Sequence, residues 1–135
     1  MYSNLVCSSS VSQPFLMISL PSYLSVIMHS DNAINRHNIR SNFRCYTCIL
    51  YCNDSWKMDK DGGALIIYPN SVDILDCDEA SRLCEGLEIN PVNGRLVIFD
   101  SRLMHAVQPV TQSVTPRRAL SLWIKRPEAR TITLA

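Results

Sequence analysis

The sequence predicts an all-β fold, a sandwich or jelly roll, with one minor helix. Seven short stretches are rich in β-branched and aromatic residues, and clusters of turn-forming residues separate them. With 47% hydrophobic and 19% charged residues, a chain of 135 residues can bury one core. The strands are expected at 15–20, 23–28, 44–52, 64–68, 95–99, 105–109 and 117–125.

One segment, residues 78–85, has a helical pattern. Asp78 is placed to cap its start, and Gly86 is placed to end it. We expect a short helix inserted into a β framework, with no role in chemistry.

The charge distribution argues against large polyanionic partners. A formal net charge of +1 and the absence of a basic stripe favour neither nucleic acid nor an anionic membrane. Residues 1–30 carry no Lys, Arg, Asp or Glu, but the apolar run is too broken for a signal peptide or a membrane span. We interpret 1–14 as a Ser-rich leader, 15–126 as the domain and 127–135 as a tail of a soluble protein.

Six cysteines raise the question of disulfides or zinc. Cys45 and Cys48 form a CxxC, but no second CxxC or His pair stands at zinc spacing. On a strand these two side chains would point to opposite faces. Buried free thiols are the favoured interpretation, and they indicate a cytoplasmic or nuclear protein.

His29-Ser30-Asp31 follows an apolar strand, and alternation places the His and the Asp on one face. His105, at the start of a later strand, can supply a third ligand. Two histidines and one carboxylate leave three positions of an octahedron open, as in non-haem Fe(II) oxygenases. By itself, HxD is a weak motif, and a His two residues from an Asp is more often a surface pair.

The last strand has two different faces. One face carries a cation, a small residue, a hydroxyl and an indole, at Arg117, Ala119, Ser121 and Trp123. Such a face makes a poor core but a suitable lining for a pocket that holds a dicarboxylate. Tyr51 could donate a second hydrogen bond to such a ligand. Arg118, on the other face, is the alternative to Arg117, and a solvated Arg pair is the simpler interpretation of both.

Several segments of the chain, in their order along the sequence, resemble those of the 2-oxoglutarate-dependent prolyl hydroxylases, in particular the hypoxia-inducible-factor (egl-nine-like) enzymes. The resemblance covers roughly residues 15–126. It rests on the HxD at 29–31, RCYTCILYCN at 44–53 with Trp56, GGALIIYP at 62–69, RLVIF at 95–99, HAVQP at 105–109 and RRALSLW at 117–123.

The resemblance implies a double-stranded β-helix (a cupin-like barrel), with His29, Asp31 and His105 on Fe(II). It implies that Arg117, with Tyr51 and Ser121 beside it, binds 2-oxoglutarate. Ile49, Leu65, Val107 and Trp123 would line the pocket. The implied enzyme is a dioxygenase that uses O2 and ascorbate, releases succinate and CO2, and hydroxylates a prolyl residue in a protein or peptide.

Family members carry N-terminal helices over the larger sheet, and only about 14 residues precede the first expected strand here. The outward faces of the strands at 44–52 and 117–125 would then leave an apolar patch uncovered. Either the chain is a fragment of a longer protein or a partner covers that face, and we expect the former. The alternative function is a catalytically degenerate or truncated β-sandwich binding module, and the oligomeric state is left open.

Overall fold

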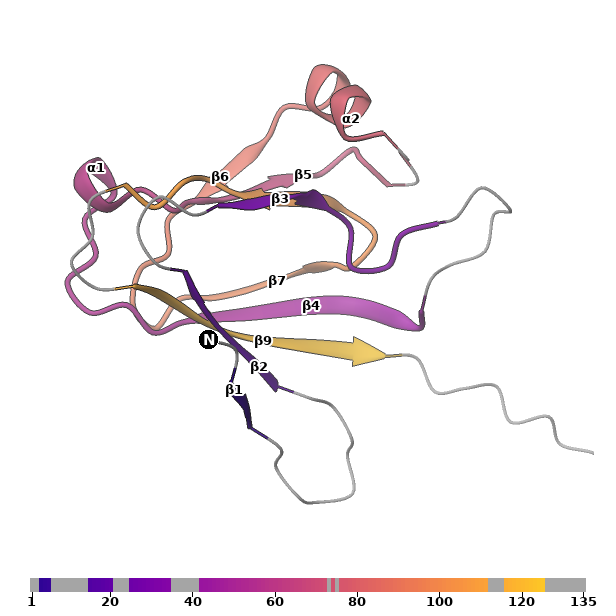
Figure 1. Ribbon diagram of the computed structural model, residues 1–135. Helices are drawn as coiled ribbons and strands as arrows, with labels where there is room; N and C mark the ends of the chain where they lie inside the picture. Colours follow the sequence, from indigo (N-terminus) through magenta and orange to yellow (C-terminus); the bar gives the residue numbers. More distant parts are fainter. Residues whose placement is uncertain are drawn as a thin grey trace, which may run out of the picture.

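The chain folds into two facing β-sheets (Figure 1), which confirms the predicted all-β jelly roll. The computed structural model describes residues 3–5, 15–20, 25–34, 42–72, 74, 76–111 and 116–125. The larger sheet has the order β1-β2-β9-β4-β7, and the smaller has the order β3-β8-β5-β6. All the pairings within them are antiparallel.

The larger sheet consists of β1 (Ser3–Leu5), β2 (Phe15–Leu20), β9 (Arg117–Lys125), β4 (Arg44–Tyr51) and β7 (Leu96–Asp100). The smaller consists of β3 (Val26–His29), β8 (Met104–Val107), β5 (Leu65–Tyr68) and β6 (Leu87–Ile89). Two short helices complete the described part, α1 (Met58–Asp61) and α2 (Cys77–Leu83). Figure 1 shows α2 above the smaller sheet, on the side away from the larger one.

Strand alternation determines which side chains enter the space between the sheets. In β4 and β9 the register pairs Ile49 with Ser121 and Tyr51 with Ala119, and all four are buried. Because side chains alternate along a strand, these residues form one inward face. The core between the sheets contains Ile49, Tyr51, Leu65, Ile67, Phe99, Val107, Val110 and Ala119.

The other face of the larger sheet is apolar and partly open. Leu96 and Ile98 on β7 are each 57% exposed, and Tyr46 on β4 and Ile124 on β9 are about half exposed. The β4–β7 and β4–β9 registers place these residues on one face. The apolar outer face expected from the sequence is therefore present in the structure.

Several elements differ from the predictions. The strands β1 and β6 and the helix α1 were not predicted, because three or four residues carry too little periodic signal. β1 lies within the segment interpreted as a leader and pairs with β2. Of the strand predicted at 23–28, residues 23 and 24 lie outside the described part, and β3 runs on to His29.

The capping prediction for α2 was wrong by two residues. The Asp76 carboxylate accepts hydrogen bonds from the backbone N–H groups of Asp78 and Glu79, at 2.7 and 3.2 Å, so Asp76 is the capping residue. Gly86 lies beyond the helix end, and a Cβ there would stand 2.6 Å from Ile66 Cγ2. Its small size therefore lets the chain pass close over β5. None of the helices in the described part is long and apolar enough to cross a membrane.

Candidate metal centre and ligand pocket

The structure brings His29, Asp31 and His105 together. His29 ends β3, Asp31 lies in the turn that follows, and His105 stands opposite His29 on the neighbouring strand β8. One ligand atom from each of the three residues lies within 4.8 Å of the others. The two imidazole rings have their centroids 4.4 Å apart. Residues separated by 76 positions in the chain thus form one group of metal-binding type.

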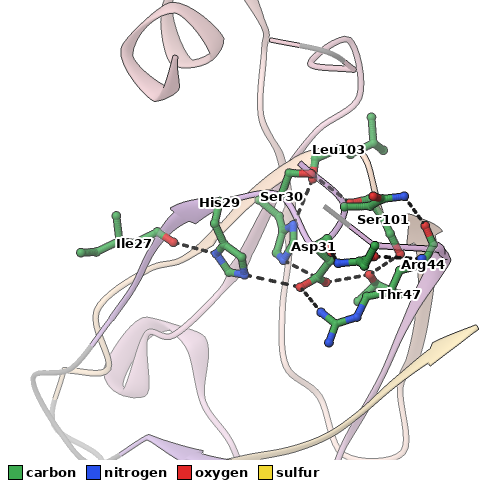
Figure 2. A network of polar contacts seen from close by, with 11 residues as sticks. Ile27, His29, Ser30, Asp31, Arg44, Thr47, Ser101 and Leu103 are labelled. Atoms are coloured by element: carbon green, nitrogen blue, oxygen red, sulfur yellow. Dashed lines mark hydrogen bonds and ion pairs between the residues drawn. The ribbon is translucent and has the colours of Figure 1, made fainter. Parts of the chain in front are cut away.

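Backbone hydrogen bonds fix the tautomers of both histidines. Nδ1 of His29 lies 2.9 Å from the Ile27 carbonyl oxygen (Figure 2). Nδ1 of His105 lies 3.1 Å from the Leu103 carbonyl oxygen. Because a carbonyl can only accept, each Nδ1 must carry the hydrogen. Both Nε2 lone pairs are then left for a metal, and they lie 3.8 Å and 3.6 Å from the Asp31 carboxylate.

Burial also favours the neutral form of His105. The residue is 5% exposed, and its ring centroid lies 4.8 Å from that of Phe99 in a T-shaped arrangement. This burial lowers the pKa of His105, His29 acts in the same direction, and the Asp31 carboxylate opposes both. A neutral imidazole is the form that binds a metal.

A second group of residues surrounds the Asp31 carboxylate. Thr47 Oγ1 donates a 2.7 Å hydrogen bond to Oδ2, and Nη1 of Arg44 lies 3.7 Å from Oδ1. The Arg44 guanidinium also lies over the Trp123 ring, 4.0 Å from its centroid. Neither Thr47 nor Arg44 was predicted as a site residue. Thr47 had a detectable signal, since it alternates in phase with Ile49 and Tyr51.

Arg117 is a buried cation on the same inward face, whereas the alternative, Arg118, is exposed on the opposite face. Nε of Arg117 donates to the Gly63 carbonyl at 2.8 Å, and Nη2 donates to the Tyr51 hydroxyl at 3.3 Å. Within the described part of the chain, no acidic side chain pairs with Arg117. Burial lowers the pKa of Arg117, and the contact with Tyr51 opposes this effect.

Gly63 shapes the seat of Arg117. Its φ is +72°, a conformation that favours glycine, and a Cβ at this position would stand 2.9 Å from Arg117 Cδ and 3.2 Å from Val110 Cγ2. In the sequence, the Gly-Gly pair is a turn signal and part of the family pattern, and neither predicts a contact with Arg117. The structure shows that Gly63 makes room for the guanidinium.

One pocket joins the histidines, the carboxylate and the buried cation. It holds about 490 Å³ of space, counting the part open to solvent. It is lined by Val26, His29, Asp31, Thr47, Ile49, Leu65, His105, Val107, Arg117, Ala119, Ser121 and Trp123. Two of the predicted cofactor and pocket residues are absent from the lining. Tyr51 is fully buried beside Arg117, and the alternative Arg118 is exposed on the opposite face. Val26 and Thr47 were not predicted to line the pocket.

Residues 22–125 match the family described as the 2OG-Fe(II) oxygenase superfamily. The chain belongs to this superfamily. Over 111 residues it is 32% identical to the hypoxia-inducible factor prolyl hydroxylase of Caenorhabditis elegans, an alignment that covers 81% of this chain and 13% of that protein. Over 89 residues it is 33% identical to the human prolyl hydroxylase EGLN3, covering 64% of this chain and 31% of that protein. The chain thus spans less than a third of the length of either relative.

Solved structures of the superfamily agree. A prolyl hydroxylase from Trichoplax adhaerens, in complex with a hypoxia-inducible factor oxygen degradation domain peptide, superposes with a TM-score of 0.65 at 28% identity. The match covers 90% of this chain and 47% of that chain. A prolyl-4-hydroxylase from Pseudomonas putida has the same fold, with a TM-score of 0.63, 23% identity, and 85% and 53% of the two chains covered.

The residues of the pocket fit Fe(II) and 2-oxoglutarate, the metal and the co-substrate for which the superfamily is named. Two imidazoles and a carboxylate are a donor set that suits Fe(II), and one ligand atom of each lies within 4.8 Å of the others. A buried guanidinium without an anionic partner is costly, and a ligand carboxylate would offset that cost. Both features belong to the same pocket.

Proposed function

We propose that this chain carries the active site of an Fe(II)- and 2-oxoglutarate-dependent dioxygenase that hydroxylates prolyl residues in a protein or peptide. The observation that carries the proposal is the pocket that joins the His29, Asp31 and His105 group to Arg117, which pairs with no acidic side chain among the described residues. Neither feature alone would distinguish a catalytic site from a structural one.

In this proposal His29 and His105 bind Fe(II) through Nε2, and Asp31 binds it through a carboxylate oxygen. Three protein ligands leave room for a co-substrate and O2. Bound iron supplies the chemistry by which O2 converts 2-oxoglutarate to succinate and CO2 and adds an oxygen atom to a C–H bond. The protein contributes the two fixed tautomers and a largely buried setting for Asp31 and His105.

Arg117 binds the distal carboxylate of 2-oxoglutarate in this proposal. Its Nε and one Nη donate to Gly63 and Tyr51, so the plane of the guanidinium is fixed before the ligand arrives. Burial raises the pKa of Tyr51, which keeps the phenol protonated, although Arg117 acts in the opposite direction. Tyr51 accepts from Arg117 and therefore acts on the ligand by holding the guanidinium, whereas Ser121 on the pocket wall supplies a hydroxyl to the ligand itself.

The relatives named as prolyl hydroxylases support a prolyl substrate, and the peptide complex from Trichoplax adhaerens supports a polypeptide one. Ascorbate as a reductant belongs to the same proposal. A cytoplasmic or nuclear location does too, and it is supported by the five cysteines of the described part, which are all free.

The proposal is tested by incubating the chain with Fe(II), 2-oxoglutarate, ascorbate and a panel of proline-containing peptides. We expect succinate to form together with a peptide that has gained one oxygen atom. His105→Ala is the control, and it should form neither. Peptide binding with no succinate above the control would contradict the proposal and favour the degenerate binding module.

A further inference from the structure

We propose that Thr47 and Ser101 are positioning residues that orient the Asp31 carboxylate for metal binding. This inference rests on the proposed function, because it takes Asp31 as a metal ligand. Thr47 Oγ1 lies 2.7 Å from Asp31 Oδ2 and 2.9 Å from Ser101 Oγ (Figure 2). Both hydroxyl residues are almost fully buried, at 1% and 0% exposure.

The direction of this hydroxyl chain follows from the number of its hydrogens. An ionised carboxylate can only accept, so Thr47 uses its one hydroxyl hydrogen on Asp31. Thr47 must then accept from Ser101, and the chain runs from Ser101 through Thr47 to Asp31. Aligned hydrogen bonds polarise one another, which strengthens the last bond to the carboxylate.

The backbone of Ser101 holds the residues on both sides of Asp31. Its carbonyl oxygen accepts from the Asn32 backbone N–H at 2.8 Å and from the Ser30 hydroxyl at 3.0 Å. Its own N–H donates to the Cys45 carbonyl at 2.9 Å, which ties it to β4. Ser101 therefore fixes the turn that carries Asp31, while its side chain acts through Thr47 on the carboxylate itself.

Ser101 also connects Asp31 to the third ligand. It lies in the turn between β7 and β8, four residues before His105. In that turn the Leu103 N–H donates to the Asp100 carbonyl at 3.0 Å, and the Leu103 carbonyl is the partner of His105 Nδ1. One short turn thus orients His105 through its backbone and Asp31 through a hydroxyl.

The identity of Thr47 is explained by this contact and not by packing. Its neighbours on the inward face of β4 are Ile49 and Tyr51, and valine would fill the same volume. A buried hydroxyl is costly unless it is hydrogen-bonded, and here both of its partners lie in the polar group around Asp31. Partners of this kind behind a metal ligand typically change metal affinity about 10- to 100-fold when they are removed.

The test measures metal affinity directly, with Co(II) as a spectroscopically visible replacement for Fe(II), by titration without 2-oxoglutarate or O2. We expect Thr47→Val to raise the dissociation constant at least about tenfold, and Ser101→Ala to raise it by less. Thr47→Ser, which keeps the hydroxyl, should restore most of the affinity. Thr111→Val is the matched control, because Thr111 Oγ1 binds the Lys60 carbonyl and no group of the metal centre. Circular dichroism spectra show whether each variant is folded.

The outcomes separate this inference from the proposed function. If the unsubstituted chain does not bind Co(II), the proposed function fails, and the positioning role fails with it. If it binds Co(II) and Thr47→Val and Ser101→Ala both bind within twofold of it, only the positioning role is overturned. A Thr47→Ser variant as weak as Thr47→Val would also overturn it, because the hydroxyl would then not be the cause. Should Thr47→Val not fold, Ser101→Ala and Thr47→Ser decide the question.

Discussion

Arg117→Met should remove 2-oxoglutarate binding without removing the metal. Arg117 is 2% exposed, and in the described part its guanidinium donates hydrogen bonds to the Gly63 carbonyl and the Tyr51 hydroxyl and to no acidic group. Methionine keeps most of the apolar volume but offers no positive charge. Losing a charge-assisted contact to a buried ligand carboxylate costs about 3 kcal/mol, which is roughly a 100-fold rise in the dissociation constant for 2-oxoglutarate.

The same substitution should not destabilise the ligand-free chain. A buried, unpaired cation opposes folding, so Arg117→Met should leave the free energy of unfolding unchanged or raise it. In the unsubstituted chain, 2-oxoglutarate at about 100 times its dissociation constant adds about 2.7 kcal/mol of stability, which is a rise of roughly 8 °C in Tm. The variant should lose almost all of this rise.

Thermal melts with Co(II), each with and without 2-oxoglutarate, provide the assay. Arg118→Met is the matched control, since Arg118 is adjacent in sequence but exposed on the opposite face. It should keep the full ligand-induced rise in Tm. If Arg117→Met kept the ligand-induced rise in Tm, this role of Arg117 would be refuted, whether or not Arg118→Met kept it too.

Three further predictions follow from the same contacts. Gly63→Ala should weaken 2-oxoglutarate binding and destabilise the chain by about 1–3 kcal/mol, because the new Cβ would meet Arg117 and the φ of this residue is positive. Calorimetry measures the binding. The control is Gly94→Ala, where φ is +74° and a Cβ would have nothing within 4 Å, and it should leave 2-oxoglutarate binding intact. Burial lowers the pKa of His105, so the unfolded metal-free chain binds a proton at this residue more readily than the folded chain does. The free energy of unfolding should therefore fall as the pH drops below about 6.5. Denaturant titrations should show a smaller fall for His105→Asn, and equal falls in the two chains would contradict this assignment. Ile98→Lys should lower dye binding to the outer face of the larger sheet and spare 2-oxoglutarate affinity, whereas unchanged dye fluorescence would show that this face is not the exposed apolar surface.

Alternation along single strands made much of the site predictable from the sequence. The inward phase of Ile49 and Tyr51, and of Arg117 and Ser121, depends only on a period of two within β4 and β9. His29 and Asp31 were placed on one face by the same reasoning. These residues needed no knowledge of which strands become neighbours.

The residues that support the site were not predictable in this way. Ser101 and Thr47 are 54 positions apart in the chain, and Gly63 and Arg117 are separated by the same number. Such contacts depend on how distant turns approach each other in the folded structure. The Asp76 cap was missed for a local reason, since both Asp76 and Asp78 are good capping residues and only the backbone decides between them.

Anaerobic visible absorption spectroscopy tests most directly whether Fe(II) and 2-oxoglutarate share this pocket. With Fe(II) and 2-oxoglutarate together, the unsubstituted chain should show a metal-to-ligand charge-transfer band that neither component produces alone. His105→Ala should abolish the band, and Arg117→Met should require far more 2-oxoglutarate to reach it. No band in the unsubstituted chain, or an unchanged band in both variants, would contradict the assignment of His29, Asp31, His105 and Arg117.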